Sequence, residues 1–371
     1  MNSIVYVGMD VHKESYTLCC YTYERDTIEY KQTIPSDYRL VFRYIENVRR
    51  KYPKDAQFIC GYEAGCLGYS LYHQLMNHNQ KCVILAPTTM AVTNTSHIKT
   101  DKRDAANIAR CLAFHTYSEV YVPSPEDNQI KEYIRMRDDH KLSLKKIKQQ
   151  ILAFVLRTGN KFDGTKRYWT QKHIKWLREL ELDPVSRETL DEYLVTFEYL
   201  IEKIERLDKR IEEFAEGEKY SEGVNKLICF MGIKKHTALA ILTEVGDFKR
   251  FPKASRFAAF LGLVPGENSS GEARNQLGIT KSGNGHLRRL LIESAQSYTR
   301  GAVGHKSVEL RKRQEGSSTR VIAYADKAGE RLRRRFYRLT LRGHVHRNKA
   351  TVAIARELSC FIWGMMTDNI A

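Results

Sequence analysis

The most constraining feature of this sequence is a change of pattern near Pro125. Before it, short apolar runs typical of strands alternate with amphipathic segments typical of helices. After it, the spacing of apolar residues is almost wholly helical. Alternating strands and helices are typical of an α/β layer around one sheet. We therefore expect an α/β N-terminal domain followed by a mostly α-helical region.

The first 120 residues are expected to contain three consecutive strands, followed by helices and strands in alternation. Ser36 is the expected N-cap of the first helix. Strands are predicted over 3–9, 16–23, 28–34, 57–62 and 81–85, and helices over 36–52, 67–77 and 102–115.

The segment 187–216 carries apolar residues at spacings of three and four, with Glu and Lys between them. This pattern is typical of a coiled coil, and it equally fits a helix that packs within its own domain. Beyond residue 221, frequent glycines predict tight turns between short helices. We expect a first domain over 1–155, a helical linker and coiled coil over 156–220, and a C-terminal domain over 221–371.

The charge balance indicates a polyanionic partner. The 371 residues include 61 Lys and Arg against 44 Asp and Glu, a formal net charge of +17. The segment 305–349 alone holds 14 basic and 4 acidic residues. Because aromatic side chains such as Tyr324 and Phe336 are interleaved there, a phosphate-backbone surface is favoured over an ordinary solvated face.

Cysteine usage and hydropathy indicate the compartment. The eight cysteines show no C-x-x-C pair and no metal-type spacing, which is typical of reduced thiols in a cytoplasmic protein. The apolar stretch 352–366 is interrupted by Arg356 and Glu357, so we expect no membrane-spanning helix. The expected location is the cytoplasm, in association with the nucleoid.

Four carboxylates form the candidate catalytic cluster. Asp10 ends the first predicted strand, Glu63 ends the fourth, and Asp101 and Asp104 begin a predicted helix. Ligands bind at the edge where the ends of neighbouring strands meet, and residues three apart share a helix face. A converging set of acids requires a cation, and Mg²⁺ with oxygen ligands suits phosphoryl transfer. Taken singly, each acid is also compatible with a turn or helix-cap role.

A second candidate lies in a glycine-rich loop that contains Ser269 and Ser270. A serine hydroxyl becomes a nucleophile only where its proton is removed and the developing charge is stabilised. From spacing alone, a plain loop remains the more common meaning of Ser-Ser-Gly. Downstream, a glycine-broken turn at Lys281 leads into a helix with Arg288 and Arg289, an arrangement that can hold a phosphate.

Other candidate phosphate contacts come from two further segments. Residues 227–247 look like a helix-hairpin-helix, whose backbone amides contact DNA phosphates, although Lys234 replaces the usual second glycine. Lys234 and Lys235 are therefore candidate nucleic-acid contacts, as are Lys102 and Arg103 between the paired aspartates.

Together, these landmarks resemble the DEDD transposases of bacterial insertion sequences, in the insertion sequence 110 family. The resemblance covers nearly the whole chain in the same order. The motifs that carry it are Gly8-Met-Asp10-Val-His-Lys, Gly61-Tyr-Glu63-Ala-Gly, Lys99-Thr-Asp101-Lys-Arg-Asp104-Ala, Met231-Gly-Ile, Phe257-Ala-Ala-Phe-Leu-Gly-Leu-Val-Pro, Ser270-Gly271, and Ile279-Thr-Lys281-Ser-Gly with Leu287-Arg-Arg.

The resemblance implies a ribonuclease H-like domain of the Holliday-junction-resolvase type, a helical coiled-coil segment and a helical C-terminal transposase domain. It implies that the four acids bind Mg²⁺ or Mn²⁺. It further implies that the serine of the Ser-Gly pair, Ser270 with Ser269 as the near alternative, attacks DNA. The partners implied are donor and target double-stranded DNA, a structured guide (bridge) RNA, and further copies of the chain in a dimer or tetramer.

Three alternatives compete with a serine-dependent recombinase. A resolvase-type metal-dependent nuclease would use water as its nucleophile, and a non-catalytic nucleic-acid-binding protein would use none of these acids. The Gly8-Met-Asp10 turn also resembles actin-like ATPases and sugar kinases, but the other glycine motifs of those families are not evident in the sequence.

Overall fold

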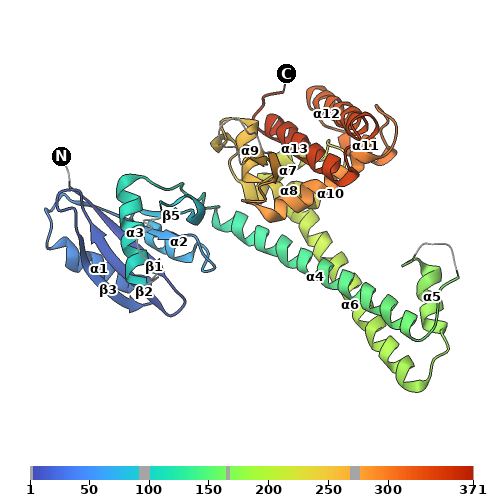
Figure 1. Cartoon of the computed structure of the whole chain (residues 1–371), viewed down its shortest axis with the longest axis horizontal. Coiled ribbons are helices and arrows are strands. Elements are labelled where there is room, and N and C mark those ends of the chain that lie inside the picture. Colours follow the sequence, from blue (N-terminus) through green and yellow to red (C-terminus); the bar gives the residue numbers. More distant parts are fainter. Residues whose placement is uncertain (1–2, 92–100, 164–167, 268–275, 371) are drawn as a thin grey trace. The chain divides into compact units, whose positions relative to one another are not determined.

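The computed structural model describes residues 3–91, 101–163, 168–267 and 276–370. The chain forms two compact units, Met1–Val122 and Pro123–Ala371. The first is a mixed α/β layer and the second is mostly helical, so the predicted fold class is confirmed at this level (Figure 1).

The first unit is built on one five-stranded sheet with the strand order β3-β2-β1-β4-β5. The first three strands pair antiparallel, whereas β1, β4 and β5 pair parallel. Its elements are β1 (Ile4–Val11), β2 (Ser15–Tyr21), β3 (Ile28–Pro35), α1 (Tyr38–Arg49), β4 (Gln57–Glu63), α2 (Ser70–Asn77), β5 (Cys82–Leu85), η1 (Pro87–Thr89) and α3 (Asp101–Phe114).

Each face of this sheet has its own core. Val5, Val7 and Met9 of β1 pack in the core that includes Tyr44 of α1 and residues of α2. The intervening β1 residue Tyr6 lies in the opposite core, with α3. Since successive strand residues point to opposite faces, the alternation along β1 assigns its even-numbered positions to the α3 face.

The predicted strands and helices of this unit are confirmed within a few residues at their ends. The predicted N-cap of the first helix is wrong by one residue. Asp37 accepts a hydrogen bond from the Arg39 amide at 2.9 Å, whereas the Ser36 hydroxyl donates to the Lys13 carbonyl oxygen at 2.8 Å. Asp and Ser cap helices equally well, so the sequence alone could not choose between them.

The second unit begins with a long helical hairpin and continues as a bundle of shorter helices (Figure 1). Its elements are α4 (Pro125–Arg157), α5 (Gln171–Glu179), α6 (Pro184–Glu216), α7 (Glu218–Leu227), α8 (Lys235–Val245), η2 (Phe248–Arg250), α9 (Ala254–Phe260), β6 (Pro265–Glu267), β7 (Gln276–Ile279), α10 (Gly285–Ala295), η3 (Gln296–Thr299), α11 (Val308–Gln314), α12 (Thr319–Tyr337), η4 (Arg338–Arg342) and α13 (Arg347–Met366).

Helices α4 and α6 run antiparallel. Arg137 of α4 pairs with Asp208 of α6 at 2.6 Å, whereas Ile151, further along α4, shares a core with Leu190, near the start of α6. The apolar positions predicted on α6 are buried from residue 190 to residue 211. Their stripe is covered by α4 of the same chain, as the within-domain interpretation expects.

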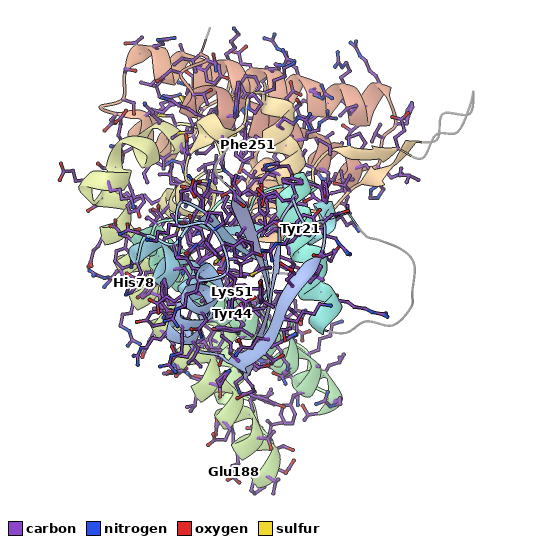
Figure 2. The ribbon with its side chains drawn as sticks, turned by 90° about the vertical axis from the view of Figure 1, so that its left-hand side faces the viewer. Tyr21, Tyr44, Lys51, His78, Glu188 and Phe251 are labelled. Carbon is purple, nitrogen blue, oxygen red and sulfur yellow. The ribbon has the colours of Figure 1, made fainter. Side chains whose placement is uncertain are left out.

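The hairpin has a separate core at each end. Near its base, Ile130 and Ile134 of α4 pack with the C-terminal helices, and at the far end Ile151 and Val155 pack with α5 and α6. Figure 2 shows Glu188, at the start of α6, at the lower tip of this unit and Phe251 far from it, within the upper bundle. Because the base of α4 belongs to the C-terminal core, the two units divide at residue 122, whereas the predicted first domain extends to 155.

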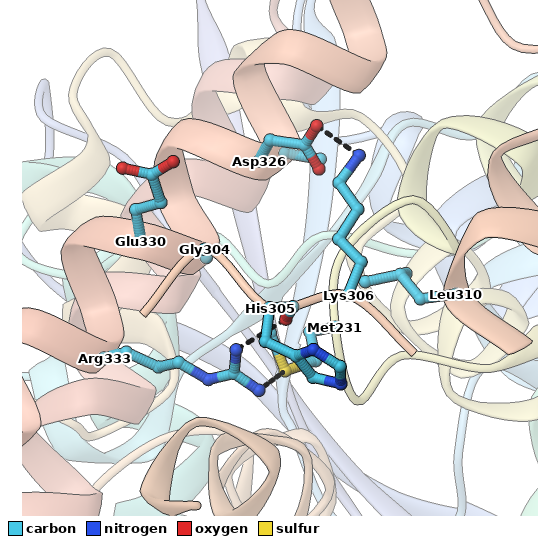
Figure 3. A pocket seen from close by; sticks show the side chains of 10 residues that line it. Met231, Gly304, His305, Lys306, Leu310, Asp326, Glu330 and Arg333 are labelled. Atoms are coloured by element: carbon cyan, nitrogen blue, oxygen red, sulfur yellow. Dashed lines mark hydrogen bonds and ion pairs between the residues drawn. The ribbon is translucent and has the colours of Figure 1, made fainter. Parts of the chain in front are cut away.

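One buried arginine fixes the irregular segment that precedes α11. Arg333 of α12 is 6% exposed and donates to the carbonyl oxygens of Ala302 and His305 at 2.7 and 2.6 Å. Figure 3 shows this guanidinium beside Met231, with the ion pair between Lys306 and Asp326 nearby. No helix in the described residues has the length and apolarity needed to cross a bilayer.

Candidate active site

Asp10 and Glu63 lie at the ends of two neighbouring parallel strands. The register pairs Met9 of β1 with Tyr62 of β4, so the next residue on each strand is one of the two acids. Adjacent strands are about 5 Å apart. Met9 and Tyr62 both pack in the core on the α1 side, which assigns Asp10 and Glu63 to the α3 face.

Two glycines allow α3 to approach this face closely. A Cβ on Gly8 would overlap the Ala105 carbonyl oxygen and lie 2.8 Å from the Ala109 Cβ. A Cβ on Gly61 would lie 2.7 Å from a Leu112 methyl group. Both distances are shorter than any van der Waals contact, so only glycine permits this helix-on-sheet packing at these two positions.

The close packing also sets the position of the remaining acids. Asp104 directly precedes Ala105, which lies against Gly8, two residues before Asp10. Asp101 is the first residue of α3, one turn before Ala105, and the side chains of Asp101 and Lys102 lie outside the described residues. Asp10 of β1, Glu63 of β4 and Asp104 of α3 thus lie where these three elements meet, at the carboxyl ends of the two strands.

The exposure of the acids differs. Asp10 is 15% exposed and its Oδ2 lies 3.2 Å from His12 Nε2, whereas Glu63 is exposed and Asp104 is half-buried. Carboxylate oxygens are the donors that Mg²⁺ prefers, so these residue types fit such an ion. Among the described side chains, no three His, Cys, Asp or Glu come close enough to hold a metal. This search does not cover all four candidate acids, because the side chain of Asp101 lies outside the described residues.

The candidate nucleophile lies between two short strands. β6 and β7 pair antiparallel, with Pro265 opposite Ile279 and Glu267 opposite Gln276. Ser269 and Ser270 fall in the connection, outside the described residues. After β7 the chain passes close to Gly262, which has a φ of +64° and stands where a Cβ would overlap the Ser282 carbonyl oxygen. This close approach fixes the end of the β6–β7 hairpin against the helix that precedes it.

Helices α7 and α8 surround the predicted helix-hairpin-helix turn, in which Gly232 has a φ of +83°. Lys234 lies 2.9 Å from Glu309, and Lys235 lies 2.6 Å from Glu216. Ion pairs this exposed contribute little free energy and can exchange for a phosphate. The predicted nucleic-acid role of both lysines stays a prediction.

The other predicted phosphate contacts differ in their surroundings. Lys281 is exposed with a φ of +57°, and Arg103 is exposed on α3. Arg288 donates to the Leu261 carbonyl oxygen at 3.0 Å, and Arg289 pairs with Asp138 of α4. In this structure both guanidinium groups on α10 therefore hold neighbouring parts of the protein together.

Sequence reasoning missed a buried cluster of ionised groups where α4, α8 and α10 meet. His286 Nε2 lies 2.9 Å from Asp138 Oδ2, and its Nδ1 lies 2.6 Å from Glu244 Oε1. Arg137 donates to Asp138 at 3.0 Å, and Arg135 donates to Glu244 at 3.0 Å. No periodicity could have revealed it, since His286 and Asp138 are 148 residues apart in the sequence. We call this set of residues the α4 junction.

The pKa values of this junction follow from its hydrogen bonds. Burial disfavours the charge on Glu244, but donors from His286, Arg135 and Asn284 outweigh it and lower its pKa to about 2. The pKa of Asp138 lies well below its usual range for the same reasons, with hydrogen bonds from His236, His286 and Arg137 outweighing its burial. Burial opposes protonation of His286, yet the two carboxylates raise its pKa. The junction is therefore an ionised, mutually paired cluster.

Comparisons with known proteins identify the family. A family model described as Transposase, for DEDD transposases of the IS110 type, matches residues 7–159. A second, described as Transposase IS116/IS110/IS902 family, matches residues 225–309. The first match contains all four candidate acids, and the second contains the candidate serines.

Individual relatives agree with this assignment. The transposase for insertion sequence element IS1533 of Leptospira borgpetersenii is 33% identical over 91% of this chain and 97% of its own length. The protein y4qE of Sinorhizobium fredii is 31% identical over 98% of this chain and 88% of its own length. The pilin gene-inverting protein of Moraxella bovis is 25% identical over 69% of this chain. The chain belongs to the IS110 family of insertion-sequence transposases, enzymes that cut and rejoin DNA.

Proposed function

We propose that this chain is a site-specific DNA recombinase that moves an insertion sequence through a transient serine–DNA bond. Asp10, Glu63, Asp101 and Asp104 would hold Mg²⁺ or Mn²⁺ at the carboxyl ends of β1 and β4. The observation that carries the proposal is the register of these strands, because it brings Asp10 beside Glu63 on the face that α3 covers. The strand order β3-β2-β1-β4-β5 supports a ribonuclease H-like domain, and the antiparallel pairing of α4 with α6 supports a coiled coil formed within one chain.

The metal would stabilise negative charge on the phosphate that is being attacked. The residues of this chain do the rest of the positioning. Gly8 and Gly61 hold α3 against the sheet, and so keep the position of Asp104 fixed relative to Asp10.

Ser270 is the proposed nucleophile, with Ser269 as the alternative. Its Oγ would form a bond to phosphorus while one P–O bond of the DNA strand breaks, and the serine proton would pass to a base or to water. Attack of the released hydroxyl end on the phosphoserine would reverse these changes and reseal the strand. The two steps together exchange phosphodiester bonds without net hydrolysis.

The proposed partners are donor and target double-stranded DNA and a structured guide RNA, on which copies of the chain would assemble as a dimer or tetramer. The proposed place of action is the nucleoid, in the cytoplasm. The formal charge of +17 supports a nucleic-acid partner. The Lys and Arg residues proposed to contact it are Lys102, Arg103, Lys234, Lys235, Lys281, Arg288 and Arg289.

A trapping experiment tests the serine step. Full-length protein is incubated with Mg²⁺, guide RNA and a nicked duplex that carries the insertion junction, and covalent adducts are separated under denaturing conditions. We expect a protein–DNA adduct that is lost in Ser270→Ala and kept in Ser269→Ala. Loss in Ser269→Ala alone would assign the nucleophile to the other serine.

Substitution of the acids tests the metal site. We expect Asp10→Asn to abolish the adduct, whereas Glu14→Gln, an exposed change just beyond the same strand, should leave it intact. Cleaved ends without any adduct would indicate the metal-dependent nuclease instead. DNA products that are unchanged in Asp10→Asn and Asp104→Asn would indicate a non-catalytic binding protein. Recombination by purified protein with no RNA present would refute the guide.

A further inference from the structure

Helix α12 has one buried side and one cationic side. Leu332 and Phe336 are buried in the C-terminal core. The exposed row follows spacings of four, three and four residues, and therefore lies along one side of the helix. At 1.5 Å per residue the row is about 16 Å long. It consists of Lys327, Arg331 and Arg334 of α12 and of Arg338, the residue that caps α12 and begins η4.

A surface groove follows this row. It is lined by the row itself and by Arg335, Glu330 and Glu357. Arg331 and Arg335 lie 2.5 and 3.1 Å from the Glu357 carboxylate, and Arg334 lies 3.0 Å from Glu330. Five cationic side chains thus line the groove together with two carboxylates, which leaves a clear excess of positive charge.

The groove continues towards the β6–β7 hairpin. A second depression shares Arg335 and is lined by Lys349 and Arg356 of α13, which packs beside α12 (Figure 1). Its other wall includes Leu277 of β7, which is 52% exposed. Among the described residues, no acidic side chain lines this second depression. The cationic groove therefore adjoins, at Arg335, a largely apolar depression that also carries Lys349 and Arg356 and that reaches the hairpin whose connection contains Ser270.

We propose that this cationic groove binds the phosphate backbone of duplex DNA and guides it to the β6–β7 hairpin. The proposal rests on the proposed function in one respect, the identity of the serine loop. A small anion would need converging donors, whereas these side chains are spread along one helix side. A row of evenly spaced cations instead fits a polyanion whose charges repeat along its length. The exposed Leu277 offers an apolar surface beside the backbone.

Neutral substitution on the row tests this groove. Arg334→Gln with Arg338→Gln removes two cations from the groove, and Arg206→Gln with Lys209→Gln removes two exposed cations from α6 as the matched control. Binding of full-length protein to fluorescent 30-base-pair DNA and RNA duplexes of arbitrary sequence is measured by anisotropy across a salt series. Thermal melting confirms that each variant is folded.

We expect the groove variant to bind the duplex about tenfold more weakly and to lose roughly 2 units of the log–log salt slope, at about 0.9 per phosphate contact. The control should bind as the parent does. Equal affinity of the two variants would overturn the proposal. So would a loss confined to a double-stranded RNA probe, which would assign the groove to RNA.

This test does not depend on catalysis. If the groove variant binds DNA normally while the serine adduct still forms in the parent, the proposal that the groove binds DNA is wrong and the proposed function stands. If the groove variant loses DNA binding while no serine adduct forms in any protein, the serine step fails and the groove stands.

Discussion

Asp138 in the α4 junction offers a sharp test of what holds the long hairpin to the C-terminal helices. Its side chain is 7% exposed and faces Arg137, His236, His286 and Arg289. Asp138→Asn keeps the shape of the side chain but removes its charge, so that these partners lose the charged acceptor that they share. Removing one member of a buried ion pair costs about 3–5 kcal/mol.

We expect the lower end of this range, about 3 kcal/mol. Arg137 retains Asp208 and His286 retains Glu244, so neither is left without an anionic partner. For a unit of this size, such a loss lowers the melting temperature by roughly 6–12 °C. Differential scanning calorimetry of the full-length protein at pH 7 measures it.

Asp139→Asn is the matched control, because the next residue along α4 is exposed. It removes the same charge from the same helix and should shift the melting temperature by less than about 2 °C. Since the pKa of Asp138 is lowered in the folded state, its contribution is present above the unfolded value of 3.8 and is lost as the pH falls below it. Equal shifts in the two variants, or a difference that grows as the pH falls from 4 to 3, would refute this reasoning.

Three further outcomes follow from contacts described above. The pKa of His286 is raised in the folded state, so its stabilising effect is complete below the unfolded value of 6.5 and is lost as the pH rises through the folded value. His286→Gln should therefore remove the decline in melting temperature that the parent protein shows at alkaline pH. A decline that persists in this variant would assign it to another group. Gly8→Ala forces a methyl group against the Ala105 carbonyl oxygen and should lower the free energy of unfolding by about 1–3 kcal/mol, measured by urea denaturation of the first unit. Unchanged stability would show that α3 can move away from the sheet. Arg333→Gln should lower the free energy of unfolding by about 2–3 kcal/mol, since two buried carbonyl oxygens lose a charged donor. Hydrogen exchange of the amides of residues 300–307 should become rapid in this variant. Unchanged exchange would contradict the role of Arg333.

Most of the first unit could be predicted from its sequence, because its local patterns agree with its tertiary environment. The apolar strands β1, β2, β4 and β5 are largely buried, and the positions of Asp10 and Glu63 at neighbouring strand ends follow from the strand order. The short distance between α3 and the sheet could not be predicted, because it depends on contacts of Gly8 with Ala105 and of Gly61 with Leu112.

The second unit was less predictable where polar groups pair over long sequence distances. The spacing on α6 predicted its buried stripe, yet it left open which helix covers that stripe. The pairing of Arg289 with Asp138 illustrates the general difficulty. From sequence alone, an arginine beside a glycine-rich turn indicates a phosphate contact, which stays a prediction, and nothing in the spacing shows that the fold also brings a buried carboxylate from a distant helix to it.

The two separate cores of the α4–α6 hairpin have a consequence for how the protein unfolds. In the part of the chain that the structure describes, Ile151 and Leu190 belong to a small separate cluster, whereas Ile130 and Ile134 share the large core of the C-terminal helices. The far end can therefore open by itself while the base stays closed, as a cooperative unit of lower local stability. Shortening both helices by matching numbers of turns would give a smaller protein that still keeps its base and its C-terminal helices intact.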